Sequence, residues 1–235
     1  MKNRVLLLFI AAASVMGEPA PLPPDAIVEN YCAATRGQAQ LLQGATMDVE
    51  IDASLPQLKK RGRLRALRRI TALGRITYEA LKFDGDGTVK NQVIARYLSA
   101  ELEAQNGQSA ALALTPANYK FKYKGRGALG GRDVHIFAVT PRKKLPGLFK
   151  GEVWIDAATY LRVQESGYLV KNPSIFLKRV KFVRTYEIRD GISVPRQVQS
   201  EIETRLAGKA ELTVDYSNFS TDTPLPDPAG EDDLQ

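Results

Sequence analysis

The sequence contains one histidine and one cysteine, His135 and Cys32, among its 235 residues. A histidine-based metal site needs several histidines, and Ser-His-Asp or Cys-His catalysis would have to use His135 itself. His135 has apolar neighbours in a predicted strand, so we interpret it as a structural residue. Cys32 cannot form an intrachain disulfide, and its place in a predicted helix favours a small buried side chain. We therefore expect no metal, no cofactor and no enzymatic activity.

Carboxylates are the other candidates for acid–base chemistry. Asp48, Glu50 and Asp52 stand at every second residue, and glycoside hydrolysis is one reaction that uses paired carboxylates. They occupy the polar positions of an alternating segment, which solvation explains more simply. Nucleotide-binding and hydrolase motifs are missing from the sequence. The Asp-Gly-Asp-Gly run at 84–87 lacks the remaining ligands of a calcium loop and predicts a hairpin turn.

The N-terminus predicts export. Residues 1–17 combine Lys2 and Arg4 with an apolar run over 5–15 and a small residue at Gly17, the pattern of a cleavable signal peptide. The run is too short for a membrane-spanning helix, and it holds no cysteine for lipidation. We expect a periplasmic or secreted protein. Residues 220–235 carry five acids and no Lys or Arg, which predicts an acidic, Pro-rich flexible tail.

A basic segment precedes the middle of the chain. Residues 59–69 contain seven Lys and Arg residues and no acid, enough to create a local field. An exported protein is not expected to bind nucleic acid, so an anionic membrane surface or an acidic envelope protein is the better partner. A solvated strand face remains the alternative. The candidates for contact with an anionic headgroup or partner are Arg63, Arg65, Arg68 and Arg69.

The apolar pattern predicts a leading helix followed by a sheet. Helical spacing runs from Asp25 to Gly44, and strict alternation follows over 45–55, which we expect to pack against that helix. Further strands are expected over 70–80 and 89–97, on either side of the hairpin turn, with short helical pieces between 99 and 116. Alternation resumes at Tyr119 and continues to Tyr216. We count about eleven strands in a single domain, residues 18–219, with one continuous curved antiparallel sheet.

Three short stretches carry a resemblance to a known family. They are Gly-Glu-Val-Trp-Ile-Asp at 151–156 followed by Thr-Tyr-Leu-Arg-Val at 159–163, Gly-Ile-Ser-Val-Pro at 191–195, and Asp-Tyr-Ser-Asn-Phe at 215–219. These stretches resemble the final strands of the periplasmic lipoprotein carriers LolA and LolB. The order of signal peptide, leading helix and strands is also similar to that family. The resemblance implies an α+β, mainly β fold: an unclosed antiparallel half-barrel of about eleven strands with helices covering its concave face.

The resemblance also implies an apolar cavity that takes lipid or lipoprotein acyl chains. We expect a monomeric, non-enzymatic lipid- or lipoprotein-binding carrier that acts in outer-membrane lipoprotein sorting or envelope maintenance. An envelope stress sensor, or an interaction protein that docks an acidic partner through the basic segment, is the alternative. The candidates for the apolar cavity wall are Met47, Val49, Ile51, Ile76, Tyr78, Phe121, Tyr123, Ile155 and Phe182.

Overall fold

The computed structural model describes residues 22–105, 109–172, 177–205 and 208–221. The predicted signal peptide and almost all of the predicted acidic tail lie outside these residues. The described part contains ten strands: β1 (Thr46–Leu55), β2 (Lys60–Ile70), β3 (Ile76–Gly85), β4 (Tyr119–Leu129), β5 (Arg132–Pro141), β6 (Phe149–Asp156), β7 (Arg162–Leu169), β8 (Leu177–Arg189), β9 (Ile192–Thr204) and β10 (Lys209–Ser220).

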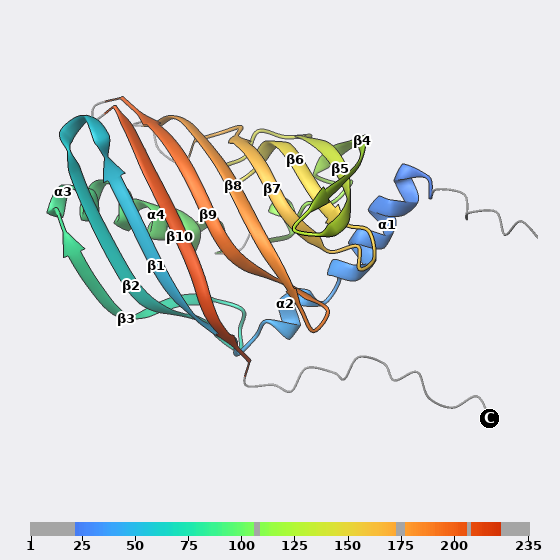
Figure 1. The fold of residues 1–235 in the computed structure, drawn as a ribbon, viewed down its shortest axis with the longest axis horizontal. Helices are drawn as coiled ribbons and strands as arrows, with labels where there is room; N and C mark the ends of the chain where they lie inside the picture. The colour runs from blue at the N-terminus through green and yellow to red at the C-terminus, as the bar shows by residue number, and fades with distance from the viewer. Residues whose placement is uncertain (1–21, 106–108, 173–176, 206–207, 222–235) are drawn as a thin grey trace, which may run out of the picture.

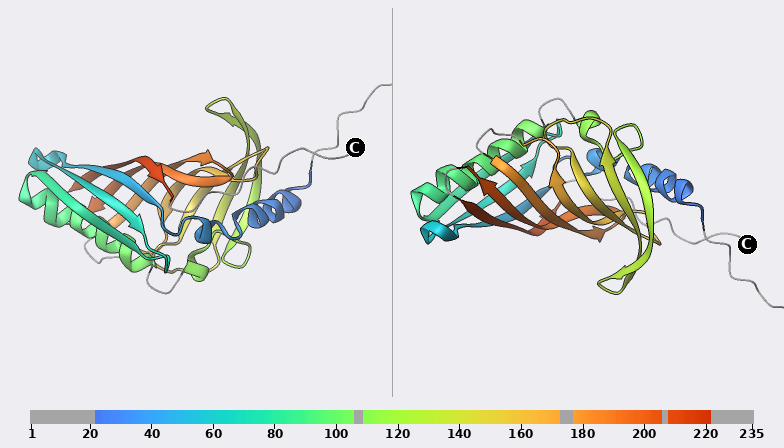
Figure 2. Two further views of the ribbon diagram at one scale, coloured as in Figure 1. Left: turned by 90° about the horizontal axis from the view of Figure 1, so that it is seen from below. Right: turned by 90° about the horizontal axis from the view of Figure 1, so that it is seen from above.

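The ten strands form one antiparallel sheet that does not close. Their order is β3-β2-β1-β10-β9-β8-β7-β6-β5-β4, so β3 and β4 are the two edges. The sheet is strongly curved and leaves one side open (Figures 1 and 2). The predicted mainly β half-barrel is therefore confirmed, with ten described strands where about eleven were expected.

Short helices connect and cover the strands. They are α1 (Pro24–Thr35), α2 (Gln38–Leu41), η1 (Pro56–Leu58), α3 (Gly87–Val89), the π-helical turn η2 (Lys90–Ile94), α4 (Ala95–Gln105) and α5 (Ser109–Leu112). The last two confirm the helical pieces predicted between 99 and 116. Figure 2 shows α4, in green, lying across the concave side of the sheet. Among the described residues, no helix is long and apolar enough to cross a membrane.

The strand predicted over 70–80 has the wrong bounds and the strand predicted over 89–97 was wrong, and both errors have a simple cause. Residues 70–80 are the end of β2, a turn and the start of β3; Thr71 donates its N–H to the Arg75 carbonyl at 2.8 Å. The turn has five residues, so the inward-facing residues before and after it, Ile70 and Ile76, are both even-numbered. The alternation of apolar residues therefore could not reveal the turn. Residues 89–97 are helical: Asp86 caps the helix by accepting the Thr88 N–H at 2.7 Å. The predicted hairpin turn is therefore a strand end and a helix cap.

The leading helix is interrupted and packs elsewhere than expected. Gly37 has a φ of +85° and separates α1 from α2, because this left-handed conformation ends a right-handed helix. The buried residues of α1, Ile27, Val28 and Tyr31, join a core with β4, β5, β6 and β8. The predicted contact between this helix and the strand at 45–55 was wrong.

The structure has two main apolar cores, one in each half of the sheet. The first joins β1, β2, β9 and β10 to Val89, Val93 and Ile94 of the helical connection. The second joins α1 to β4–β6 and to Phe182 of β8. Because each half has its own helices to fill it, the space between the halves is not filled by either core.

A pair of glycines lets β6 and β7 approach closely. Gly151 and Gly167 face each other across the ladder, and a Cβ on Gly151 would lie 1.8 Å from the backbone oxygen of Ser166. We expect Gly151→Ala to lower the free energy of unfolding by about 1–3 kcal/mol, because a backbone shift is required. Gly87→Ala is the control, since nothing lies within 4 Å of its Cβ position. Equal denaturation midpoints for both variants would contradict this prediction.

Candidate functional site

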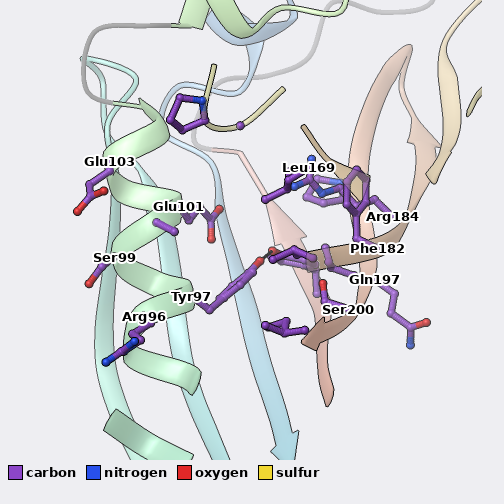
Figure 3. A pocket seen from close by; sticks show the side chains of 18 of the residues that line it. Arg96, Tyr97, Ser99, Glu101, Glu103, Leu169, Phe182, Arg184, Gln197 and Ser200 are labelled. Carbon is purple, nitrogen blue, oxygen red and sulfur yellow. Dashed lines mark hydrogen bonds between the residues drawn. The ribbon is translucent and has the colours of Figure 1, made fainter. Parts of the chain in front are cut away.

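A cavity of about 900 Å³ lies between the helix α4 and the concave face of the sheet. Its floor is made by β8 and β9 and its roof by η2 and α4 (Figure 3), and residues 145–147 also line it. Members of both cores reach it, Met47 and Val198 from the first and Phe182 from the second. The apolar side chains that line the cavity include Leu42, Ile70, Val93, Leu112, Leu145, Leu169, Leu177, Val180, Phe182, Val198 and Ile202.

A buried group of charges sits in the floor of the cavity. Arg162 donates to the Glu165 carboxylate at 2.9 Å, and Tyr186 donates its hydroxyl to the other oxygen, also at 2.9 Å. Arg184 lies 3.7 Å from that second oxygen. We call these four residues the arginine cluster. Arg162, Arg184 and Tyr186 line the cavity, whereas Glu165 lies behind them, 2% exposed.

A β-bulge makes this cluster possible. Trp154 pairs with Gln164 but Ile155 pairs with Arg162, so β7 carries one extra residue opposite β6. A bulge turns the following side chains to the other face of a strand. Arg162 and Glu165, which differ in parity, can therefore meet on the same side of the sheet.

The arginine cluster keeps its charges at neutral pH. Burial alone would raise the pKa of Glu165, but attraction by Arg162 and Arg184, together with the hydrogen bonds from Tyr186 and Arg162, outweighs burial and the pKa is lowered. Burial alone would lower the pKa of Arg184, but Tyr186 and Glu165 reverse the effect and the pKa is raised. Two cations therefore share one anion in this part of the cavity.

A second charged group joins α4 to the sheet. Arg68 of β2 donates to Glu101 of α4 at 3.2 Å, and Tyr78 of β3 donates its hydroxyl to the same carboxylate. Arg68 is 7% exposed. Burial is the largest influence on the pKa of Tyr78, which is raised, so Tyr78 stays a donor. This group holds the roof of the cavity to β2 and β3.

The predicted cavity residues fall into two groups. Met47 and Phe182 line the cavity. Val49, Ile51 and Ile155 are buried inside the two cores, and Ile76 belongs to a third, small core. Tyr78, Phe121 and Tyr123 pack against the cores and do not reach the cavity wall. The alternation indicates which residues face the concave side, but it does not separate a filled part from an open one.

The predicted basic face is divided by the structure. Arg63, Arg65 and Arg69 are on the outer side of β2 and pair with Asp52, Glu50 and Glu79, at 2.7, 2.6 and 3.2 Å. Arg68 has the opposite parity and points inward, where it lines the cavity. Acids of the neighbouring strands therefore offset the three outer arginines, which the local sequence does not reveal.

The arginine cluster is not among the predicted site residues, although the sequence contains a signal for it. Glu165 continues the parity of Leu161 and Val163, and Arg184 stands between Phe182 and Tyr186 on an apolar parity. A charged residue in such a position must be paired when it is buried. Arg184 and Tyr186 reach Glu165 from the neighbouring strand β8, and Arg162 reaches it across a bulge in β7, so the pairing required the fold.

The remaining candidate residues, His135 and Cys32, do not line the cavity. His135 is 5% exposed, and its Nδ1 lies 3.3 Å from the Tyr123 hydroxyl. Burial lowers the pKa of His135, so the ring is neutral at physiological pH. Cys32 is a half-buried free thiol on α1. Within the described ranges, no group of three or more His, Cys, Asp or Glu residues could hold a metal ion.

Fold and site define an open antiparallel half-barrel whose helices cover a mainly apolar cavity. The sequence matches no protein-family model and no curated protein. The structure is similar to a DUF1329 family protein from Desulfovibrio piger, with a TM-score of 0.48 and 17% identity over 87% of this chain and 95% of that one.

Two further solved structures bear names related to the family that the sequence resembles. A putative outer membrane lipoprotein-sorting protein domain from Vibrio parahaemolyticus has a TM-score of 0.42 and 14% identity, over 86% of this chain and 93% of that one. A LolA superfamily protein from Nitrosomonas europaea has a TM-score of 0.39 and 14% identity, over 88% and 96%. The similarity concerns the fold alone.

Proposed function

We propose that this protein is a non-enzymatic binding protein or carrier that holds the acyl chain of a lipid or lipoprotein in the cavity beneath α4. The cavity carries the proposal: it has about 900 Å³, mainly apolar walls and a place between two separate cores. This volume lies within the range of ligand sites, which are typically apolar with a few polar groups. Transfer of an acyl chain into it would be favoured by about 25 cal/mol per Å² of apolar surface.

The predicted signal peptide indicates the compartment in which this carrier would work. An exported carrier would work in the periplasm or outside the cell, where lipids and lipoproteins must cross an aqueous space. We therefore propose a role in lipoprotein sorting or envelope maintenance. The alternative function, docking of an acidic partner through the outer arginines of β2, has less support, because acids of neighbouring strands already pair with these arginines.

Native purification followed by solvent extraction and mass spectrometry tests the proposal directly. We expect a co-purifying lipid, and uptake of labelled phospholipid or lipopeptide by the extracted protein. A protein that is free of lipid and takes up neither probe would overturn the proposal.

Filling the cavity is expected to weaken the binding of lipid. Val180 lines the cavity, whereas Val183 of the same strand is 39% exposed on the other face. We expect Val180→Trp to weaken binding of labelled lipid at least about tenfold, a loss of about 1.4 kcal/mol. Val183→Trp is the matched control and should bind like the unmodified protein. Equal binding by both variants in a fluorescence titration would place the lipid elsewhere.

A further inference from the structure

The arginine cluster gives the cavity a chemical preference that its apolar walls do not explain. Deepening the proposed function, on which this inference rests, we propose that the ligand is an amphiphile with one anionic headgroup, a carboxylate or a phosphate ester. Arg162 and Arg184 bind that headgroup, and the apolar chain lies along β8 and β9 beneath α4.

The charges of the arginine cluster do not cancel. Arg162 and Arg184 face one carboxylate, Glu165, and the Tyr186 hydroxyl is neutral. One positive charge is left in excess within the cluster. A charge enclosed by protein is costly unless an anion or hydrogen-bond acceptor accompanies it. The anionic headgroup would supply that partner.

Both arginines of the cluster line the cavity. Their side chains are 35% and 40% exposed although both guanidinium groups lie deep in the protein. Both residues line the cavity, so the exposed area faces the cavity. Arg184 is farther from Glu165, at 3.7 Å, than the 2.9 Å of Arg162. Its N–H donors are therefore less committed to Glu165 than those of Arg162.

Aromatic rings hold both guanidinium groups in place. The Arg162 Cζ lies 4.5 Å from the centre of the Tyr186 ring, and the Arg184 Cζ lies 4.5 Å from that of Phe182. Stacking of this kind fixes the plane of a guanidinium and leaves its edge for hydrogen bonds to an oxyanion. A preorganised donor loses little entropy on binding.

An apolar path continues from the cluster. Phe182 connects the arginine cluster to the apolar part of the cavity wall. It stacks with Arg184, and it lines the cavity together with Val180 and Leu169. Figure 3 shows Arg184, Phe182 and Leu169 on the side of the cavity opposite Tyr97 and Glu101 of α4. The juxtaposition of a positive end and an apolar channel matches an anionic amphiphile, not a neutral or cationic one.

Four probes with the same C16 chain test the inference on the full, delipidated protein. Hexadecanoate, hexadecyl phosphate, hexadecanol and hexadecyltrimethylammonium would compete with the neutral fluorophore N-phenyl-1-naphthylamine at concentrations below micelle formation. We expect either or both anions to bind at least about tenfold more tightly than hexadecanol, as for a hydrogen bond to a charged group. The stronger of the two anions identifies the headgroup.

Three variants separate the cluster from general charge. Arg184→Gln should bring the anion-to-alcohol affinity ratio close to one while hexadecanol binding stays unchanged, and Arg184→Lys should retain most of the ratio. Arg179→Gln removes the same charge from an exposed position of β8 and should leave the ratio unchanged.

The possible failures are distinguishable. Equal binding of anions and hexadecanol by the unmodified protein would overturn this inference and leave the proposed function intact. An unchanged ratio in a folded Arg184→Gln variant would also overturn it. Failure of all four probes to compete would overturn the proposed function itself.

Discussion

Phe137→Ala is expected to lower the free energy of unfolding by about 3–5 kcal/mol, the usual loss for a buried phenylalanine. Phe137 is 1% exposed in the centre of β5. Its ring contacts those of Tyr123 and Phe121, with centroids at 5.1 and 6.1 Å. The second core would keep a cavity there, because α1 and the sheet can only partly collapse around it. Urea denaturation monitored by circular dichroism measures the loss.

Phe121 offers a matched comparison on the neighbouring strand β4. It is half-buried and packs against the same core from its edge. Phe121→Ala removes the same atoms but leaves a space that solvent can reach, so we expect less than half of the loss. Similar losses for the two variants would show that the burial of Phe137 does not carry the stability of this core.

Glu165→Gln is expected to have an effect of similar size with almost no change in volume. The substitution leaves Arg162 and Arg184 without their shared anion in the interior. Breaking a buried ion pair from one side typically costs about 3–5 kcal/mol. Glu201→Gln on β9 is the control: Glu201 is 66% exposed and lies 4.0 Å from Lys181, so its loss should stay below about 1 kcal/mol.

The pH dependence gives this prediction a second readout. The pKa of Glu165 is lowered in the folded protein, because its two arginines outweigh burial. The stabilisation is therefore complete above the ordinary carboxyl pKa of about 4.3 and is lost as the pH falls through the lower folded value. The stability difference between the unmodified protein and Glu165→Gln should shrink in that range. A difference that is independent of pH would contradict the role assigned to the carboxylate.

Local pattern was sufficient for most strands and insufficient near the turns. The segment at 45–55 is a strand with its apolar residues inward, as its alternation predicts. The segment at 89–97 is helical instead of a strand. The pattern was ambiguous because Val89 and Val93 are four residues apart, a spacing that fits both a helix face and a strand face. The Asp86 side chain caps the start of this helix by accepting the Thr88 N–H, and such a cap favours the helix.

The order of residues is enough to indicate a mainly β fold with an inward apolar face, since alternation and composition are local properties. The site depends on contacts between distant segments. Arg162 and Glu165 come from β7 and Arg184 and Tyr186 from β8, and they meet only because a bulge and strand pairing bring them together. The same holds for the cavity: whether an apolar face is filled or open depends on how the helices pack against it.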